Sequence, residues 1–393
     1  MTRQYTHLVI GGGVAGGRAV EALSKRADSV ALISAEQWRP YSRPPLSKEA
    51  LVDGRSIGSL CLRDPSWYEA QGAELWLGDR VVALDPHEPV VELASGSVIS
   101  FDHLLLAPGV EPIRLNVPGG DLAGVHYLRT YDDAIQLRHA VEVRDRQCRV
   151  VIVGGGFIGS EIAASLAKMN VQVTIVEAMT QLMGQALGDE VGSLLTERHR
   201  EAGVDVLLDA RVDSVLGGAS VEGVRLADGT DIACELVVVG IGARPQLDWL
   251  AGSGVDIDGG IVVDQYCRTS RSNVYAAGDA AFMYSPRLGR HRRLEHEANA
   301  QSQGVVAARN MLGGSAVHDP IEYCWSTQHD LDIWTLGHTS RGSEVSLEVE
   351  ADGRQALAFY RDSGRIVGVA GINRPDDLTR ARELLTSLTA AIA

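Results

Sequence analysis

The sequence predicts an α/β protein that contains two Rossmann-like units. The main observation is one design that occurs twice: a short apolar strand, a GxGxxG turn, a helix and a second apolar strand. The first copy runs from His7 to Ser34 and the second from Val150 to Glu177. Glycine is abundant, with 43 residues that cluster in such turns. The length of 393 residues leaves room for two or three domains at roughly 150 residues each.

The spacing of each GxGxxG turn suits a bound dinucleotide. The first glycine permits the tight turn, the second lets the backbone approach a pyrophosphate, and the third lets helix and strand pack closely. The helix that follows offers unpaired N–H groups to the phosphates. A single such turn is a weak indication, because glycine-rich turns are common. Two copies in the full strand–turn–helix–strand context predict two dinucleotide sites.

An acidic residue about 20 positions after the turn can accept hydrogen bonds from ribose hydroxyls. In the second unit Glu177 directly follows its strand, and no arginine stands in the next few positions. A carboxylate there repels a 2′-phosphate, so we expect this site to prefer NADH over NADPH. In the first unit Glu36, preceded by Ala35, is the only candidate acid near the strand end.

The composition excludes several other classes of protein. Lys and Arg number 36 and Asp and Glu 51, for a formal charge of −15, so nucleic acid is not expected as a partner. No apolar run approaches the ~18 residues of a membrane span, and the N-terminus lacks a secretory pattern. We therefore expect a soluble cytoplasmic protein with no membrane attachment.

The cysteines are few and scattered. The five are Cys61, Cys148, Cys234, Cys267 and Cys324, and no two of them form a CxxC pair. Structural disulfides, zinc sites and a thioredoxin-like dithiol are therefore not predicted, and no metal site is expected.

Six further blocks of sequence indicate a family. They are Arg43–Lys48 (RPPLSK), Tyr127–Thr130 (YLRT), Gly154–Glu161 (GGGFIGSE), Val239–Pro245 (VGIGARP), Tyr275–Ala280 (YAAGDA) and Trp325–Gln328 (WSTQ). With them, nearly the whole chain resembles the FAD-dependent, NADH-dependent ferredoxin reductases that serve bacterial oxygenases and cytochromes P450. The resemblance implies a glutathione-reductase-like fold with an FAD domain (1–113 and 240–314), an NAD domain (114–239) and a C-terminal α+β interface domain (315–393).

The resemblance also implies which residues bind the cofactors. For FAD these are Gly11, Gly13, Ala15, Gly16, Glu36, Arg43, Lys48, Val81, Arg129, Asp279, Glu297 and Trp325. For NAD they are Gly154, Gly156, Phe157, Ile158, Gly159, Glu161, Glu177 and Gly242. In an alignment without gaps on Pro44–Lys48, the usual FAD ribose acid falls on Ala35 rather than Glu36. Either the strand end shifts by one residue or that hydrogen bond is lost.

Three residues are expected to act at the flavin. The resemblance implies that Lys48 pairs with Glu161 there, orients the nicotinamide and stabilises negative charge on reduced flavin. It implies that Phe157 covers the flavin until nicotinamide displaces it. The alternatives are an ordinary surface lysine after Pro44–Pro45 and a core aromatic at 157; Trp325 is likewise either a wall of the flavin site or core packing.

Two motifs depart from the family pattern. Its usual Ala-Thr-Gly triplet stands here as Ala107-Pro108-Gly109, and its Ser-Asp-Gln motif as Ser326-Thr327-Gln328, followed by His329 where an aromatic residue is usual.

The absence of a redox dithiol indicates the electron acceptor. Disulfide reductases of this fold carry a cysteine pair where this chain has Arg43–Lys48, so electrons must leave directly from the flavin. Flavin accepts a hydride and can release single electrons, which suits an iron–sulfur acceptor on another protein. We expect an NADH:ferredoxin oxidoreductase that reduces a [2Fe–2S] ferredoxin and, through it, a Rieske dioxygenase or cytochrome P450, as in aromatic hydrocarbon catabolism. The alternatives are a rubredoxin- or quinone-type reductase and an NADH-responsive binding flavoprotein such as apoptosis-inducing factor.

A basic segment is the candidate docking site for ferredoxin, which is usually acidic. Arg287, Arg290, His291, Arg292 and Arg293 fall within seven residues that we interpret as an exposed loop. The alternatives are a solvated charge run with no partner and an inward-turned Arg293. The protein is expected to be a monomer or a weak homodimer.

Overall fold

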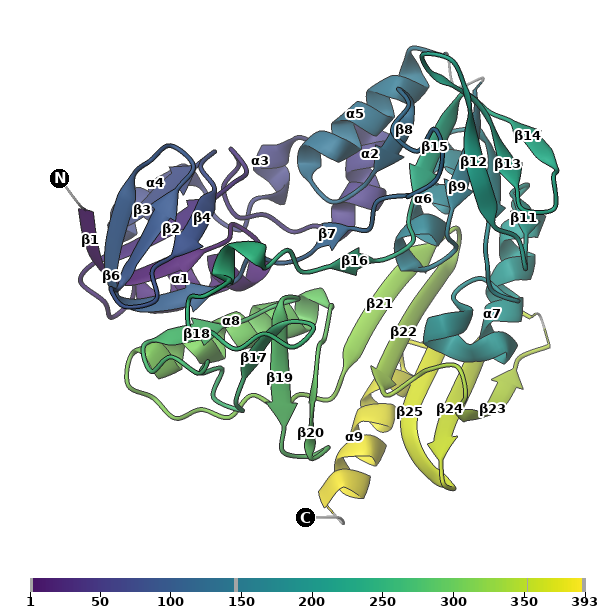
Figure 1. Ribbon diagram of the computed structural model, residues 1–393. Coiled ribbons are helices and arrows are strands. Elements are labelled where there is room, and N and C mark those ends of the chain that lie inside the picture. Colours follow the sequence, from purple (N-terminus) through teal and green to yellow (C-terminus); the bar gives the residue numbers. More distant parts are fainter. Residues whose placement is uncertain (1–2, 145–147, 352, 391–393) are drawn as a thin grey trace. The chain divides into compact units, whose positions relative to one another are not determined.

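The structure is a computed structural model that describes residues 3–144, 148–351 and 353–390 (Figure 1). The chain forms two compact units, each assembled from three segments. Unit 1 comprises Met1–Ser42, Ser56–Glu111 and Arg244–Pro320, and unit 2 comprises Arg43–Arg55, Pro112–Ala243 and Ile321–Ala393. The short strands β7 (Glu111–Pro112) and β16 (Ala243–Arg244) mark the places where the chain passes from one unit to the other.

Unit 1 is built on a seven-stranded sheet in the order β3-β2-β1-β6-β5-β4, with β18 also paired to β6. Strands β1, β2, β3, β6 and β18 run parallel, whereas β4 and β5 are antiparallel. The bounds are β1 (Arg3–Ile10), β2 (Val30–Ser34), β3 (Ala73–Leu77), β4 (Val81–Leu84), β5 (Val90–Leu93), β6 (Val98–Leu106) and β18 (Val274–Ala276). Every residue of β2 is buried, as expected for a parallel strand covered on both faces.

Two long helices cover one face of this sheet. α1 (Val14–Leu23) packs against α8 (Glu297–Met311), and the contact is close because a Cβ at Gly304 would lie 2.2 Å from the carbonyl oxygen of Ala15. Successive residues of β1 point to opposite faces, so Val9 joins the core under these helices while Leu8 joins the core on the other side. The remaining elements of unit 1 are α3 (Ile57–Leu60), α4 (Pro65–Gln71), η2 (Asp248–Leu250), and a three-stranded sheet of β17 (Ile261–Val263), β19 (Ala281–Ser285) and β20 (Arg290–Arg292).

Unit 2 contains a second parallel sheet in the order β11-β10-β9-β15-β8. Its strands are β8 (Val125–Tyr127), β9 (Arg149–Val153), β10 (Gln172–Val176), β11 (Asp205–Leu207) and β15 (Leu236–Val239). The accompanying helices are η1 (Pro44–Ser47), α2 (Glu49–Asp53), α5 (Tyr131–Glu142) and α6 (Phe157–Lys168). A separate antiparallel sheet holds β12 (Val212–Gly217), β13 (Val221–Leu226) and β14 (Asp231–Ala233).

The C-terminal part of unit 2 is a five-stranded antiparallel sheet in the order β21-β22-β25-β24-β23. Its elements are β21 (Tyr323–Gln328), β22 (Leu331–Gly337), β23 (Glu344–Val349), β24 (Ala356–Asp362), β25 (Arg365–Ile372) and α9 (Asp377–Ala390). Helix α7 (Gly184–Glu201), kinked at Gly188, packs its residues Leu187, Val191 and Leu195 against this sheet. The Tyr360 hydroxyl donates to the Leu187 carbonyl at 2.7 Å, while α9 contributes Ala381 and Leu385 to a separate core cluster.

The predicted α/β class with two Rossmann-like sheets and a C-terminal sheet domain is confirmed. Within the described residues, no helix is long and apolar enough to cross a membrane.

Candidate active site

The structure explains why glycine stands at each position of the first turn, and the reason differs from one glycine to another. Gly11 has φ +112°, and a Cβ there would lie 2.0 Å from the Ala107 carbonyl oxygen; a Cβ at Gly16 would lie 2.0 Å from the Gly11 carbonyl oxygen. Gly13 differs, because its φ is −76° and no heavy atom of the described residues lies within 4 Å of a Cβ built there. Packing therefore requires the first and third glycines, whereas the second leaves open space beside the backbone, as a bound pyrophosphate needs.

The second turn repeats this arrangement in unit 2. Gly154 has φ +100° and would place a Cβ 2.5 Å from the Gly240 carbonyl oxygen, and a Cβ at Gly159 would lie 1.9 Å from the Gly154 carbonyl oxygen. Gly156 has φ −75°, and again no heavy atom among the described residues lies within 4 Å of its built Cβ. Both turns thus leave a cradle at the same position.

The helix ends behind these turns favour anions. Among the described residues, no side chain caps α1 or α6, and neither helix has an acid in its first turn. Helix α5, by contrast, closes its own N-terminus with a capping box between Thr130 and Asp133. Open N–H groups and the positive end of the helix dipole suit a phosphate. The residues present therefore fit the pyrophosphates of FAD and NAD.

The two units differ at the end of the strand that follows each turn. The Gly154 N–H donates to the Val176 carbonyl and the Gly11 N–H to the Ile33 carbonyl, so Glu177 and Ser34 hold equivalent positions. Glu177 is buried, and its carboxylate accepts from the N–H groups of Gly155 and Met179. This carboxylate lies directly behind the turn, where it is fixed relative to the cradle.

The sequence-predicted acid of the first unit, Glu36, lies two residues beyond that strand end. Its carboxylate accepts from the Tyr41 hydroxyl at 2.5 Å, and its N–H donates to Ser34 Oγ at 3.2 Å. The position equivalent to Glu177 is therefore a serine, rather than Ala35 or Glu36.

The other FAD residues predicted in unit 1 come from three elements. Ala15 packs against the position of Gly278, where a Cβ would lie 3.1 Å from the Ala15 Cβ, so the loop at Asp279 adjoins the start of α1. Glu297, the first residue of α8, accepts from Ser42 Oγ at 3.0 Å and from Gln301 Nε2. Val81 is buried in β4.

In unit 2 the structure brings Lys48 and Glu161 together as an ion pair. Lys48 Nζ lies 2.6 Å from Glu161 Oε2, and the two side chains are 20% and 6% exposed. Ser47 Oγ donates to the same carboxylate oxygen at 2.5 Å, and Ser326 Oγ donates to Oε1 at 2.7 Å. Lys48 stands between η1 and α2, and α2 contacts α6, which carries Glu161. Lys48 is thus a paired, largely buried cation rather than a surface lysine.

The remaining predicted residues of unit 2 lie at the surface or its edge. Phe157 begins α6 and packs in part against the α7 cluster, while Ile158 is 45% exposed. Trp325 is 38% exposed and stacks on Tyr323 with ring centroids 6.1 Å apart. The remaining three are Arg43 and Arg129, joined by a 2.6 Å hydrogen bond from Arg43 Nη1 to the Arg129 carbonyl, and Gly242, exposed with φ +110°.

The interpretation of residues 287–293 as an exposed loop is wrong in part: residues 286–289 form a turn, whereas residues 290–292 after them do not form a loop. Residues 290–292 form β20, paired with β19, and Gly289 with φ +63° supplies the turn before it. The Arg292 side chain is 9% exposed and lies against Asp319 and the Pro320 carbonyl. Arg287 donates to the same two residues, and Arg293 pairs with Glu295. Of the four arginines, Arg290 is exposed and the other three are partly buried.

No disulfide joins any of the cysteines, and several of the thiols are buried. The five cysteines, all within the described ranges, are free, and burial raises the pKa of Cys234, Cys267 and Cys324 to about 12. A thiol with so high a pKa is protonated at neutral pH and is a poor nucleophile.

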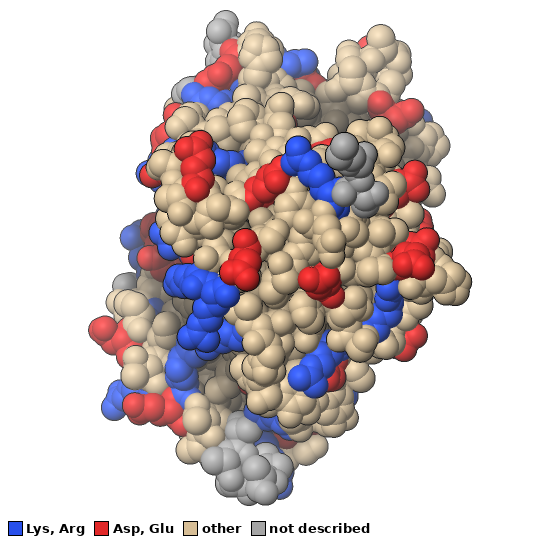
Figure 2. Space-filling view, turned by 90° about the vertical axis from the view of Figure 1, so that its left-hand side faces the viewer, with Lys and Arg blue, Asp and Glu red and all other residues tan. Residues whose placement is uncertain are grey.

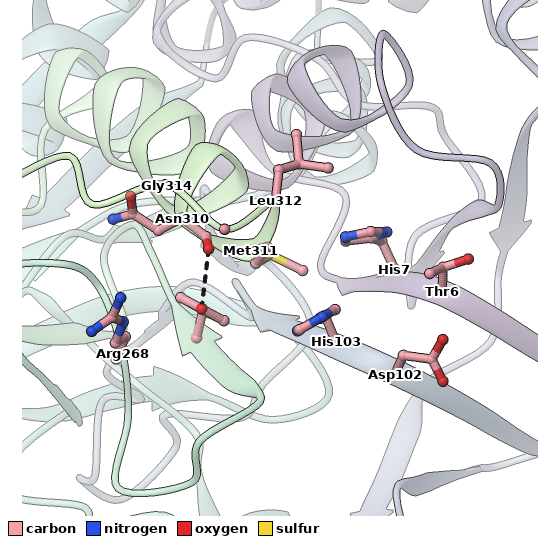
Figure 3. A pocket seen from close by; sticks show the side chains of 11 residues that line it. Thr6, His7, Asp102, His103, Arg268, Asn310, Met311, Leu312 and Gly314 are labelled. Atoms are coloured by element: carbon pink, nitrogen blue, oxygen red, sulfur yellow. Dashed lines mark hydrogen bonds between the residues drawn. The ribbon is translucent and has the colours of Figure 1, made fainter.

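A cavity of about 500 Å³ in unit 1 lies apart from these residues (Figure 3). His7 and His103 stack there with centroids 5.3 Å apart, and the Tyr275 hydroxyl donates to the Asn310 carbonyl. None of its described lining residues is one of the predicted site residues.

The sequence analysis did not predict the two hydrogen-bond donors to Glu161, Ser47 and Ser326, or the residues that follow Ser326 in the same network, Gln328 and His199. The alternation along Trp325–Gln328 places Ser326 and Gln328 on one face of a strand, which is an available indication. No sequence pattern connects His199 to them.

The chain matches known proteins over nearly its whole length. The family described as pyridine nucleotide-disulphide oxidoreductase matches residues 5–304, and the one described as reductase C-terminal matches residues 323–392. The ferredoxin–NAD(+) reductase component of the anthranilate 1,2-dioxygenase system of Burkholderia cepacia is 36% identical over 386 residues, which cover 97% of this chain and 94% of that relative.

Two solved structures are similar throughout. The ferredoxin reductase for the CYP199A2 system of Rhodopseudomonas palustris has a TM-score of 0.91 at 34% identity, over 96% of this chain and 93% of that one. The covalent putidaredoxin reductase–putidaredoxin complex gives 0.91 at 29% identity, over 98% and 93%. The chain therefore belongs to the pyridine nucleotide-disulphide oxidoreductase family and, within it, to the ferredoxin reductases of bacterial oxygenase systems.

Proposed function

We propose that the protein is an NADH-dependent ferredoxin reductase that binds FAD and passes electrons to a [2Fe–2S] ferredoxin of an oxygenase system. The observation that carries this proposal is the pair of open cradles at Gly13 and Gly156 together with the largely buried Lys48–Glu161 ion pair. Two dinucleotides and a fixed cation suit hydride transfer between them. We also propose the three-domain division given above, a cytoplasmic location, where NADH is available, and a monomer or weak homodimer.

Each part of the chain has a proposed task. The open N–H groups of α1 and α6 hold one pyrophosphate each, and Glu177 binds the ribose hydroxyls of NADH and disfavours a 2′-phosphate. Lys48 donates hydrogen bonds that orient the nicotinamide, while Glu161 keeps the ammonium in place. When bound, FAD accepts a hydride and releases electrons singly.

The remaining predicted residues complete the two sites. We propose that FAD is lined by Glu36, Arg43, Val81, Arg129, Asp279, Glu297 and Trp325. NAD is lined by Phe157, Ile158 and Gly242. The five cysteines are free, and none stands in the Arg43–Lys48 segment, so the proposal has electrons pass from the flavin to the partner protein directly.

The basic segment 287–293 offers a partner fewer exposed arginines than the sequence suggested. Arg287, Arg292 and Arg293 make contacts within unit 1, so we propose that Arg290 is the arginine of this segment that steers the ferredoxin. In the face shown in Figure 2, acidic side chains are scattered while several basic ones gather in one group, so a chain of net charge −15 still presents basic surface.

Reversing the charge at Arg290 tests this surface. Arg290→Glu should lower ferredoxin reduction severalfold at low salt, mostly through association, and the difference should shrink at high salt. Reduction of ferricyanide by NADH needs no docking and serves as the control. If both activities fall together, Arg290 acts elsewhere; if neither changes, docking lies on another surface.

Steady-state assays test the whole proposal against its rivals. The purified FAD-loaded protein should reduce a [2Fe–2S] ferredoxin with NADH faster than it reduces a rubredoxin or a quinone. Transfer to rubredoxin or quinone alone would favour those reductases. NADH oxidation that stays slow with every acceptor would favour a binding flavoprotein.

A further inference from the structure

A chain of hydrogen bonds runs from Glu161 through unit 2 to the surface. Ser326 Oγ donates to Glu161 Oε1 at 2.7 Å, and Gln328 Nε2 donates to Ser326 Oγ at 3.1 Å. Gln328 Oε1 lies 3.1 Å from His199 Nε2, and His199 Nδ1 lies 3.1 Å from His329 Nε2. Ser326, Gln328 and His199 are each 1% exposed, and the chain ends at the partly exposed His329.

The chemistry of each group fixes the direction of every bond. A carboxylate only accepts, so Ser326 must donate its proton to Glu161 and accept with a lone pair. Its donor is the Gln328 amide nitrogen, which turns Gln328 Oε1 toward His199. An amide oxygen also only accepts, so His199 must carry its proton on Nε2 and accept at Nδ1. His329 then donates from Nε2.

This order of bonds requires a neutral His199, because a charged ring would carry a proton on Nδ1 as well and could not accept there. Burial, and then the neighbouring His329, lower the pKa of His199 to about 4. Burial, and then Arg198, lower the pKa of His329. The charged groups around this end of the chain are Arg198 and Arg354, both paired with Asp330.

The polar side chains of this hydrogen-bond network lie beside apolar side chains. Gln328 pairs with Leu331 and Ser326 with Ile333 between β21 and β22, and the Gln328 amide approaches the Met183 sulfur at 3.9 Å. Met183, Leu331 and Ile333 belong to one apolar core cluster. Apolar side chains of similar shape would pack there without any need for partners. A fully satisfied polar network in such a place specifies one arrangement of its members.

We propose that Ser326, Gln328, His199 and His329 form a relay that positions Glu161 for its pairing with Lys48. Lys48 holds Oε2 together with Ser47, so Ser326 is the donor that fixes Oε1 and thereby the rotation of the carboxylate. The four are positioning residues, since they act through Glu161. The inference rests on the proposed function, because that function places Lys48 and Glu161 at the nicotinamide.

The first test reads the relay without any enzymatic turnover. Long-range ¹H–¹⁵N spectra of the full-length, FAD-loaded protein labelled with ¹⁵N-histidine report the tautomer of each ring, and His199→Gln identifies the His199 signals. We expect a neutral His199 with its proton on Nε2 at pH 7. A proton on Nδ1, or a charged ring, would overturn the relay.

The second test measures flavin reduction by NADH in a stopped-flow instrument. Ser326→Ala should lower the limiting rate roughly tenfold with the NADH dissociation constant unchanged, as for the loss of a hydrogen bond to a charged group. Thr327→Ala is the matched control, because Thr327 is exposed on the same strand and bonds Asp332. A limiting rate for Ser326→Ala equal to that of the unmodified protein contradicts the proposal.

The third test uses two changes at one position. His199→Leu removes the donor to Gln328, whereas His199→Gln retains an N–H there, so the glutamine variant should recover part of the rate lost in the leucine variant. Equal rates in the two variants contradict the relay. If NADH does not reduce the unmodified protein, the proposed function fails, while the tautomer of His199 still decides the relay.

Discussion

The two GxGxxG turns share a backbone and differ in what lies around them. Gly13 and Gly156 have φ within one degree of each other, −76° and −75°, and both leave open space. At the strand end, however, the first unit has Ser34 where the second has the buried Glu177. On the following helix, Arg18 pairs with Glu21 at the position where the second unit has Glu161 paired with Lys48. We propose that the common turn binds phosphate in both units, and that the residues that differ set which nucleotide each unit selects and what it does there.

Matched alanine substitutions at the glycines should have the largest effects. Gly11→Ala and Gly154→Ala each put an alanine at a backbone position of positive φ and press its Cβ against a carbonyl oxygen. Each should therefore destabilise the protein by about 3 kcal/mol or more. Gly13→Ala and Gly156→Ala should leave thermal stability of the apoprotein unchanged but weaken one dinucleotide each, roughly tenfold or more. Calorimetry and titrations with FAD and NADH measure these effects. If Gly13→Ala and Gly156→Ala weakened binding of the same dinucleotide, the assignment of one dinucleotide to each unit would be wrong.

Breaking the ion pair of the second unit should have the next largest effect. Lys48→Ala and Glu161→Ala should each slow flavin reduction about a hundredfold while FAD stays bound, and the double variant should be little worse than either. Arg18→Ala, at the matching place in the first unit, should leave the rate unchanged because Arg18 pairs with Glu21 of its own helix and not with Lys48. Additive losses in stopped-flow reduction would mean that Lys48 and Glu161 are not coupled.

Substitutions at the strand ends should have a smaller effect, on the preference for NADH over NADPH. Glu177→Ala should narrow the preference for NADH over NADPH about tenfold, or about 1.4 kcal/mol, because the repulsion of a 2′-phosphate is lost. Ser34→Ala is the matched change in the first unit and should not alter it. The ratio of kcat/KM values for the two nucleotides checks this, and equal values in the unmodified protein would exclude the proposed selectivity.

Each unit also holds a buried histidine whose effect on stability depends on pH. Burial lowers the pKa of His199 in unit 2 and of His318 in unit 1 to about 4. An unfolded histidine titrates near 6.5, so the unfolded state binds more protons between pH 6.5 and 4 and stability falls as pH falls through that window. Each should cost about 1 kcal/mol between pH 7 and 5.5, measured by denaturant unfolding at a series of pH values. His199→Gln should flatten this dependence; an unchanged slope would show that His199 is not buried and neutral.

The parts of the molecule that were predictable from sequence are those set by local pattern. Strand, turn and helix are neighbours along the chain, so the spacing of Gly11–Gly16 and Gly154–Gly159 was enough to predict both Rossmann-like units. The interpretation of residues 287–293 failed because Asp319, which neutralises Arg292, lies far along the chain. Ser326 and His199 were missed as partners for the same reason: contacts between side chains from different elements leave no periodicity in the sequence.

The packing of helix α7 limits where the protein can be truncated or joined to a relative in a chimaera. Although it follows β10 in the Rossmann order, its residues Leu187, Val191 and Leu195 are buried against the C-terminal sheet. A chain that ended before β21 would present these three side chains to water, and a transplanted C-terminal sheet would arrive without its cover. The C-terminal sheet is therefore not an exchangeable module, and chimaeras between relatives should carry α7 and the sheet from the same parent.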